Sequence, residues 1–285
     1  TWKEVTDLYG TTPVIYGLET ACSAFQRDIP RDDASVGVSG LFNTGTNPLA
    51  MYLSANCIMP NNTHDKAGKG MRWQVPWGKH MLASRKWTNT AGHDDKVNKT
   101  NVLPVVLIRD PYSWMQSMCK HSYAAKWIRG QGHRCPNLVP SANEQRNGSK
   151  SFAVTVDYPN QPAHFDSLAD FWSEWYNEYI NAEYPRLVVR FEDLIFHQRE
   201  LIGQICQCAG AVPKGDTFVY VVGEGKWGAA HKGSSNMISA MIKYGKSSSR
   251  LAHLTEEDLV WAQYHIDPGL MKLFHYKQPT LSAVS

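Results

Sequence analysis

The sequence contains no apolar run long enough to cross a bilayer. A membrane-spanning helix needs about 20 consecutive, mostly apolar residues, whereas the strongest run here, Val102 to Ile108, ends at Arg109 and Asp110. The chain also lacks a charged start followed by an apolar stretch, which a secretion signal requires. We therefore expect no membrane span within this chain, with any upstream signal or anchor either absent or already removed.

An excess of charge of one sign is also missing. Twenty-nine Lys and Arg side chains against 26 Asp and Glu give a formal net charge of +3, which does not favour a nucleic acid as the main partner. A small anionic ligand needs only a local basic patch. Hydrophobic residues make up 42% of the 285 residues, enough apolar surface to exclude a disordered chain.

Cysteine is scarce and scattered, and its spacing is not typical of a disulfide scaffold or a zinc site. We expect Cys206 and Cys208 to be ordinary apolar residues of a helix, and no metal ion. Acceptor patterns for N-glycosylation begin at Asn61, Asn98 and Asn147, but they matter only in a secretory compartment. They favour the Golgi lumen slightly over the cytoplasm. The six cysteines are Cys22, Cys57, Cys119, Cys135, Cys206 and Cys208.

Three segments of the sequence read as a strand followed by a helix. They are strand 36–39 with a helix from residue 48, strand 102–108 with a helix over 113–128, and strand 186–191 with a helix over 192–209. Such alternation predicts an α/β fold in three layers, with a mostly parallel central sheet covered on both faces.

The remaining segments are polar or carry their own helix signals. Residues of about 60–100 and 130–165 are rich in Gly, Pro and Asn and are predicted to be insertions in a single domain over 1–285. Short strands are expected at 73–76 and 217–222. The aromatic stripe within 167–184 is read as core packing in preference to a binding platform, and Thr255 to Asp258 as a capping box.

The segment from Gly40 to Asn47 lies between a predicted strand and a predicted helix. In parallel sheets ligands bind at such junctions, and we expect successive backbone N–H groups there to hold an anion; a plain connecting turn is the alternative. Gly40 and Gly45 keep the offset of a Walker A loop, but Thr46 and Asn47 stand where that motif has Lys and Ser or Thr. Hydrolysis of ATP or GTP is therefore not expected.

A second candidate element runs from Arg109 to Ser117. The arginine ends a predicted buried strand, and the serine follows eight residues later on the helix that this strand feeds. A planar guanidinium with a nearby hydroxyl suits a phosphate monoester. The alternative is an ion pair between Arg109 and Asp110.

These elements resemble the P-loop sulfotransferases. Gly40-Leu-Phe-Asn-Thr-Gly-Thr-Asn47 is similar to their phosphosulfate-binding loop, which is usually Pro-Lys-x-Gly-Thr-Thr. Arg109 to Ser117 resembles their 3′-phosphate-binding strand and helix, and Arg190-Phe-Glu-Asp-Leu194 a segment that follows in the same order. The resemblance touches three places between residues 36 and 194.

The resemblance implies transfer of a sulfuryl group from 3′-phosphoadenosine 5′-phosphosulfate (PAPS) to a hydroxyl or amine of a glycan or small metabolite. The desulfated nucleotide, PAP, is the product, and no metal is required. The backbone of Thr44 to Asn47 would hold the phosphosulfate, and Arg109 and Ser117 the 3′-phosphate. A basic loop containing Lys232 and Gly233 would close over the nucleotide.

A looser similarity concerns the catalytic base. Lys79-His80 resembles the Lys-x-His segment that carries the general base in cytosolic members, which implies that His80 deprotonates the acceptor. A solvated surface histidine is the alternative, with His64, His93 or a carboxylate such as Glu192 as the base instead.

The sequence departs from the family pattern at two positions. The family's loop lysine falls on Asn43, which carries no charge, so Asn43 would contribute only its amide. Either another cation, such as Lys79 or Lys232, takes over, or the protein binds the donor and transfers slowly. Pro48 stands where a tryptophan often stacks on adenine.

Other functions stay open at this point. A nucleotide- or glycan-binding module without transfer activity fits the uncharged Asn43. A P-loop phosphoryl transferase would need ATP and Mg²⁺. A glycosyltransferase is the weakest candidate, because no Asp-x-Asp pair is present. Trp73, Trp77 and Trp87 either contact the acceptor or fix the long loop.

Overall fold

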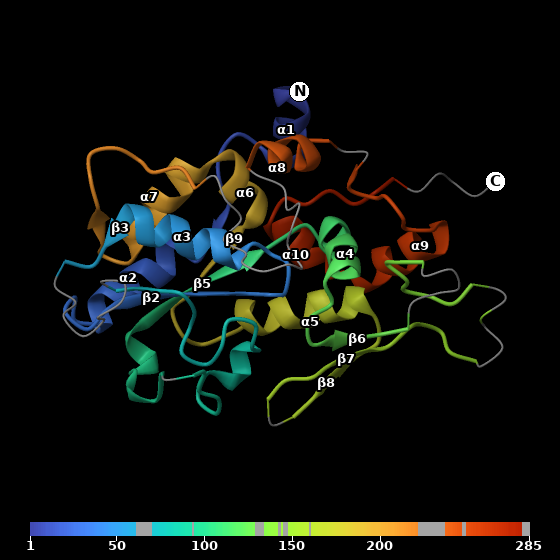
Figure 1. Cartoon of the computed structure of the whole chain (residues 1–285), viewed down its shortest axis with the longest axis horizontal. Helices are drawn as coiled ribbons and strands as arrows, with labels where there is room; N and C mark the ends of the chain where they lie inside the picture. The colour runs from blue at the N-terminus through green and yellow to red at the C-terminus, as the bar shows by residue number, and fades with distance from the viewer. Residues whose placement is uncertain are drawn as a thin grey trace.

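The centre of the protein is a five-stranded, mostly parallel sheet (Figure 1). The computed structural model describes residues 1–60, 70–92, 94–128, 134–141, 144, 148–159, 161–221, 237–246 and 249–280. The strands of this sheet are β1 (Ile15–Tyr16), β2 (Ser35–Gly40), β4 (Met71–Arg72), β5 (Val102–Ile108) and β9 (Leu187–Arg190). Their order is β1-β9-β5-β2-β4; only β1 runs antiparallel to its neighbour.

Helices surround this sheet, and none in the described ranges has both the length and the apolar character of a membrane crossing. The α-helices described are α1 (Trp2–Tyr9), α2 (Leu18–Asp28), α3 (Thr46–Asn56), α4 (Pro111–Lys120), α5 (Leu168–Ile180), α6 (Phe191–Phe196), α7 (Gln198–Cys208), α8 (Met237–Tyr244), α9 (Glu256–His265) and α10 (Pro268–Leu273). Single 3₁₀ turns occur at η1 (Ala83–Lys86), η2 (Asp94–Lys96) and η3 (Lys99–Asn101).

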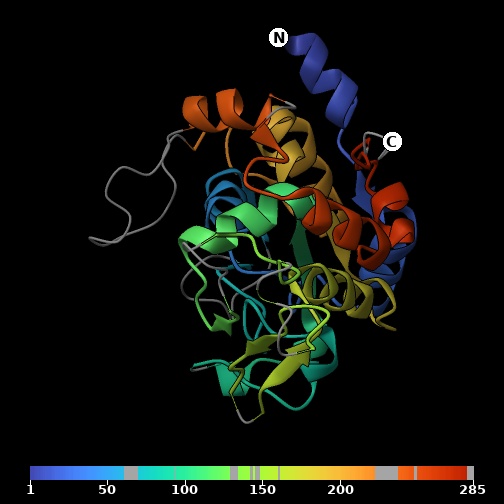
Figure 2. The ribbon, with the colours of Figure 1, turned by 90° about the vertical axis from the view of Figure 1, so that its right-hand side faces the viewer.

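Two small antiparallel sheets complete the architecture. One pairs β3 (Cys57–Ile58) with β10 (Val212–Pro213), and the other joins β6 (Ala125–Lys126), β7 (Val154–Val156) and β8 (Ala163–Phe165). In the turned view of Figure 2, the three-stranded sheet lies at the bottom with the teal segment 70–101, and α8 lies at the top.

Alternate residues of β5 face two separate cores, as the period of two in a strand requires. Leu103, Val105 and Leu107 pack with α2, α3 and α7 on one face of the sheet. Val106 and Ile108 pack with α4 and α5 on the other. The expected α/β arrangement, with a mostly parallel sheet covered on both faces, is therefore confirmed.

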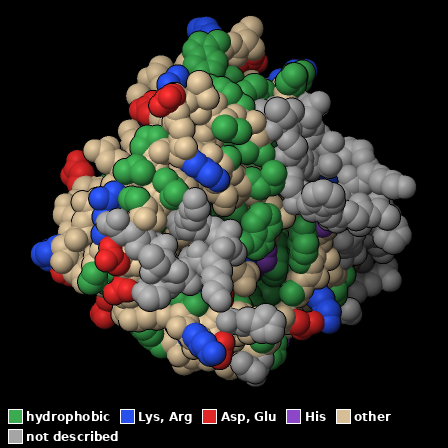
Figure 3. Space-filling view, turned by 60° about the vertical axis from the view of Figure 1, so that its left-hand side comes forward, with side chains coloured by type: hydrophobic (Ala, Val, Ile, Leu, Met, Phe, Trp, Pro, Cys, Tyr) green, Lys and Arg blue, Asp and Glu red, His purple; other side chains and the backbone are tan. Residues whose placement is uncertain are grey.

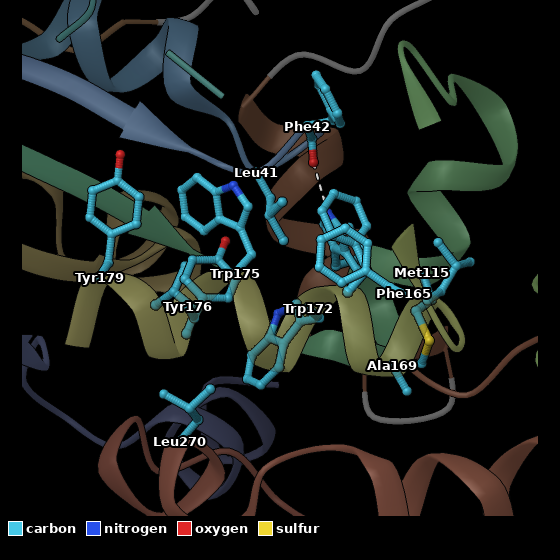
Figure 4. Close-up of a cluster of buried hydrophobic side chains, with 14 of the residues drawn as sticks. Leu41, Phe42, Met115, Phe165, Ala169, Trp172, Trp175, Tyr176, Tyr179 and Leu270 are labelled. Carbon is cyan, nitrogen blue, oxygen red and sulfur yellow. Dashed lines mark hydrogen bonds between the residues drawn. The ribbon is translucent and has the colours of Figure 1, made fainter. Parts of the chain in front are cut away.

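The aromatic stripe of α5 is core, as its helical spacing predicts. Trp172, Trp175, Tyr176 and Tyr179 are fully buried beneath the sheet (Figure 4). Their polar atoms fix strand ends: Trp172 Nε1 donates to the Arg109 carbonyl at 2.9 Å, and the Tyr176 hydroxyl to the Leu107 carbonyl at 2.9 Å. Burial of these groups thus holds the carboxyl end of β5 in place.

The expectation for the cysteines is wrong. All six form disulfides: Cys22–Cys208, Cys57–Cys206 and Cys119–Cys135. The first two join residues 186 and 149 positions apart, because α7 packs against α2 and β10 pairs with β3 beside it. Spacing along the chain carries no signal for bonds of this kind.

Some element boundaries also differ from the predicted ones. The helix predicted over 113–128 ends at Lys120, since Ala125 turns instead into β6 and pairs with Val156. The helix predicted over 192–209 is broken at His197, whose backbone leaves the helical region. The strand near 73–76 is β4 at Met71–Arg72, and residues 217–221 form no strand. The capping box at Thr255 is confirmed.

Candidate active site

The carboxyl ends of β2 and β5 lie at the point where the strand order of the sheet reverses. From β2 the chain passes through α3 to β4 on one side, and it then crosses to β5 on the other side of β2. Helix α3 packs on one face of the sheet and α4 on the opposite face. In open α/β sheets the crevice between such diverging helices is where ligands bind.

The loop from β2 to α3 is held by its own backbone. The Thr44 hydroxyl donates to the Leu41 carbonyl at 2.7 Å. Gly45, the N-cap of α3, has φ 87°, and a Cβ there would lie 2.7 Å from the Phe191 ring, so only glycine fits. Gly45, as the N-cap, makes no side-chain cap hydrogen bond, and the amino end of a helix is a favourable place for an anion.

Asn43 links this loop to α4. Its backbone is left-handed, with φ 61°. Its side-chain amide donates to the His121 carbonyl at 2.7 Å and approaches the Met118 sulfur at 3.2 Å. The amide therefore points toward the carboxyl end of α4, and it is the Asn43 carbonyl that meets Arg109.

Arg109 is buried, at 3% exposure, at the end of β5. Its guanidinium donates to the Asn43 carbonyl at 2.8 Å, to the Ser113 hydroxyl at 3.2 Å and carbonyl at 3.1 Å, and to the Tyr244 hydroxyl at 2.8 Å. The expected alternative partner, Asp110, is instead paired with Arg250 at 2.6 Å. Among the described residues Arg109 thus has only neutral acceptors, and a buried cation of this kind favours an anionic ligand.

Ser117 lies on the same face of α4 as Ser113, one turn later. Its half-buried hydroxyl donates to the Ser113 carbonyl at 3.2 Å. The structure thus brings Ser117 near Arg109 through Ser113, which makes the direct contact.

Two residues of the site were missed in the sequence. Ser113 follows Arg109 by four positions in the first turn of α4, a spacing that could have indicated it. Tyr244 is 135 residues away, and nothing local marks it. Burial alone would raise the pKa of the Tyr244 hydroxyl, but Arg109 and Lys243 together outweigh it and lower the pKa.

Lys79 reaches the amino end of α3 from the neighbouring segment. Its carbonyl accepts hydrogen bonds from Gly40 N and the Ser39 hydroxyl, both at 3.0 Å, which ties its backbone to the end of β2. Its Nζ donates to Asn47 Oδ1 at 2.9 Å and lies 3.9 Å from the centre of the Trp73 ring. Burial lowers the pKa of Lys79 to about 7.

His80 is fixed by the same strand end. Its Nδ1 lies 2.6 Å from the Gly40 carbonyl; because a carbonyl only accepts, Nδ1 carries the proton and Nε2 has the free lone pair. Burial lowers the pKa of His80 to about 4, the Gly40 bond opposing the shift. The ring is therefore a neutral base at physiological pH.

An aromatic wall stands beside His80. The Phe42 ring centre lies 4.7 Å from the imidazole, and Tyr123, half exposed, stacks on Phe42 at 5.5 Å. The space-filling view in Figure 3 shows hydrophobic side chains gathered around a hollow on one face of the molecule. A planar or sugar ring could pack on such a wall.

The other candidates have different outcomes. Lys232, Gly233, His64 and His93 lie outside the described residues. Glu192 is fully buried and accepts hydrogen bonds from Asp110 N at 3.1 Å and the Tyr276 hydroxyl at 2.9 Å. Burial, reinforced by Asp110, raises its pKa to about 7. Because its carboxyl group is fully buried, Glu192 is a poor candidate for the base.

Two further observations delimit the site. No group of three or more His, Cys, Asp or Glu side chains in the described ranges is arranged to hold a metal ion. A cavity of about 880 Å³ lies at the far end of α3, where it is lined by Asn56, Phe25 and Ile202. It is separate from the groups that converge at Thr46.

No family model, curated protein or solved structure matches this chain.

Proposed function

We propose that this chain is a PAPS-dependent sulfotransferase whose P-loop-like donor site lies between β2 and β5. The observation that carries the proposal is the convergence of three separate segments at this switch point. Hydrogen bonds join the loop before α3 to the buried Arg109 on one side and to the Lys79–His80 pair on the other. Such a site combines hydrogen-bond donors that can bind an anion with a neutral histidine that can act as a base.

The nucleotide PAPS carries two anionic groups, and the site offers two sets of hydrogen-bond donors to bind them. The N–H groups of Thr44 to Asn47, at the positive end of α3, would hold the 5′-phosphosulfate. Arg109 and Ser117, with Ser113 between them, would hold the 3′-phosphate. A phosphate there gives Arg109 a charged acceptor in place of neutral ones. Lys232 and Gly233 remain predicted to close over the nucleotide.

Transfer needs a base on the acceptor side and a cation on the donor side. As the acceptor oxygen bonds to sulfur, the bond from sulfur to the bridging phosphate oxygen breaks, and Nε2 of His80 takes the acceptor's proton. Lys79, beside the amino end of α3, would offset the charge that grows on the leaving oxygen. It would thereby replace the loop lysine whose position Asn43 occupies.

The decisive experiment is a transfer assay with PAPS labelled on sulfur. Hydroxylated glycans, phenols and amines would be screened as acceptors, with PAP binding followed by calorimetry in parallel. Label in at least one acceptor, together with PAP binding that is lost in Arg109→Gln, is the expected result. Failure of the chain to bind either nucleotide would reject the proposal.

A binding module without transfer activity is the second candidate. It is favoured by the loop from Leu41 to Asn47, which contains no lysine or arginine, and by the Asn43 amide, which is bonded to the His121 carbonyl. Equal affinity for PAPS and PAP with no label in any acceptor would favour this function.

A further inference from the structure

The three disulfides indicate the kind of compartment in which this chain folds, and this indication does not depend on the proposed activity. Disulfides form and persist in oxidising compartments and are rare in the reducing cytosol. Every cysteine of the chain is paired in the structure. A protein made in the oxidising lumen of the secretory pathway also meets the enzymes that glycosylate Asn-x-Ser/Thr.

Asn98 is the acceptor pattern that the structure describes most completely. Asn98 is the N-cap of the turn η3 (Lys99–Asn101), which lies directly before β5, and the Asn98 side chain is exposed. Its Oδ1 accepts hydrogen bonds from Thr100 N at 3.1 Å and from the Thr100 hydroxyl. Its Nδ2, where a glycan attaches, donates to no acceptor within the described ranges.

The turn is anchored without that nitrogen. Lys99 Nζ donates to the Asn89 carbonyl at 2.6 Å, and Asn101 N donates to the Asn98 carbonyl at 3.1 Å. A substituent on Nδ2 of Asn98 therefore leaves these bonds and the Oδ1 contacts intact.

A glycan at this position also leaves the candidate active site open. Asn98 precedes the first residue of β5, whereas Arg109 follows its last. At about 3.3 Å per residue, the seven residues of this strand separate the two ends of the sheet by roughly 20 Å.

We propose that Asn98 is an N-glycosylation site. The co-reactant is an oligosaccharide carried on a lipid diphosphate. A bond forms between Nδ2 and the first sugar carbon, the bond from that carbon to the diphosphate oxygen breaks, the lipid diphosphate leaves, and Nδ2 loses one proton. Asn61 and Asn147, the acceptor residues of the other two patterns, lie outside the described ranges.

The test is to read position 98 directly. The chain is produced behind a cleavable signal sequence in a eukaryotic secretory host and treated with an amidase that releases N-glycans, which converts each glycosylated Asn to Asp. Mass spectrometry of the peptides is expected to find Asp at position 98. Unmodified Asn98 in folded, disulfide-bonded protein would overturn the proposal.

Matched variants in the same turn give a second readout. On gels, Asn98→Gln and Thr100→Ala should each lose one glycan relative to the unaltered chain, whereas Thr100→Ser and the control Asn101→Gln should keep it. Identical migration of all four variants would also overturn the proposal. Sulfotransferase activity enters neither readout, so this inference stands or fails separately from the proposed function.

Discussion

The guanidinium of Arg109 and the backbone carbonyl of Asn43 are joined by a hydrogen bond of 2.8 Å. Arg109 directly follows β5, and Asn43 lies in the loop after β2, 66 positions earlier. This single bond couples the predicted 3′-phosphate ligand to the predicted phosphosulfate loop. A ligand that displaces Arg109 should therefore also displace the loop.

Replacing Arg109 with Ala should weaken PAP binding by about 2–4 kcal/mol, as the loss of a buried charge-assisted contact does. Calorimetric titration measures the change, and urea unfolding confirms that the variant is folded. Arg85, an arginine bonded to the exposed Gln161 side chain, provides the control variant Arg85→Ala. Equal affinity in the Arg109→Ala variant would remove this residue from the donor site.

Lys79 and Lys86 form a matched pair for a pH experiment. Burial lowers the pKa of Lys79 to about 7 and that of Lys86 to about 8, from an ordinary 10.5. Between these values and 10.5 the unfolded chain binds more protons, so the free energy of unfolding rises as pH rises. Lys79→Met and Lys86→Met should each flatten this rise, measured by urea unfolding at several pH values.

The same two variants separate stability from catalysis. Lys86 Nζ lies over the Tyr184 ring at 3.8 Å, whereas Lys79 Nζ contacts Asn47 at the start of α3. Transfer should therefore fall in Lys79→Met and stay unchanged in Lys86→Met. Equal losses in both variants would show that Lys79 acts only through folding.

His80→Gln should slow transfer by about 10²- to 10⁴-fold, because the acceptor loses its general base, while PAP binding stays intact. Burial holds the pKa of His80 at about 4, so the acid limb of the rate profile should lie near pH 4. His164, whose contact with Thr155 is exposed, gives the control His164→Gln. An acid limb that persists in His80→Gln would assign the base to another residue.

The same shift has a consequence for stability. The depressed pKa of His80 means that the unfolded chain takes up a proton first, as pH falls from about 6.5 to about 4. Above about pH 6.5 His80 is neutral in both the folded and the unfolded chain, so its burial costs no stability. The free energy of unfolding falls as the pH falls from about 6.5 to about 4. This contribution should be missing in His80→Gln.

Asn43→Ala should lower the free energy of unfolding by about 1–3 kcal/mol. Alanine is strained in the left-handed backbone conformation of residue 43, which asparagine tolerates better, and it lacks the amide that donates to the His121 carbonyl. Asn43→Gly also loses the hydrogen bond to His121, but glycine adopts the left-handed conformation without strain, so this variant should be destabilised less. Urea unfolding of the two variants gives the comparison. If Asn43→Gly is instead the less stable variant, the left-handed conformation at position 43 strains alanine little.

Features set by neighbouring residues could be predicted from the sequence. The continuous apolar run of β5, the aromatic stripe of α5 and the capping box at Thr255 all follow from local periodicity or local hydrogen bonding. Nothing local marks the break at His197, since the pattern contains no Pro and its one Gly, Gly203, lies within α7 and not at the break.

The parts of the site that could not be predicted depend on packing between distant segments. Tyr244 reaches Arg109 across 135 residues, and Arg250 pairs with Asp110 across 140. The sequence also offered Glu192 as an alternative base, because burial is not visible in a short motif. The loop, Arg109 and His80 were each predicted from a local motif. The hydrogen bonds that tie Arg109 and His80 to the loop depend on how distant segments pack, which no local motif shows.

The Cys57–Cys206 disulfide closes a covalent ring around residues 58–205. Arg109 and His80 lie inside this ring, and the loop from Leu41 to Asn47 lies outside it. A protease that cuts the backbone once within the ring leaves both halves of the crevice on one covalent molecule, so the nick becomes visible only after reduction. Residues 60–100 and 130–165, which the sequence predicts to be insertions, thus belong to a stretch of chain that one cut opens without releasing a fragment.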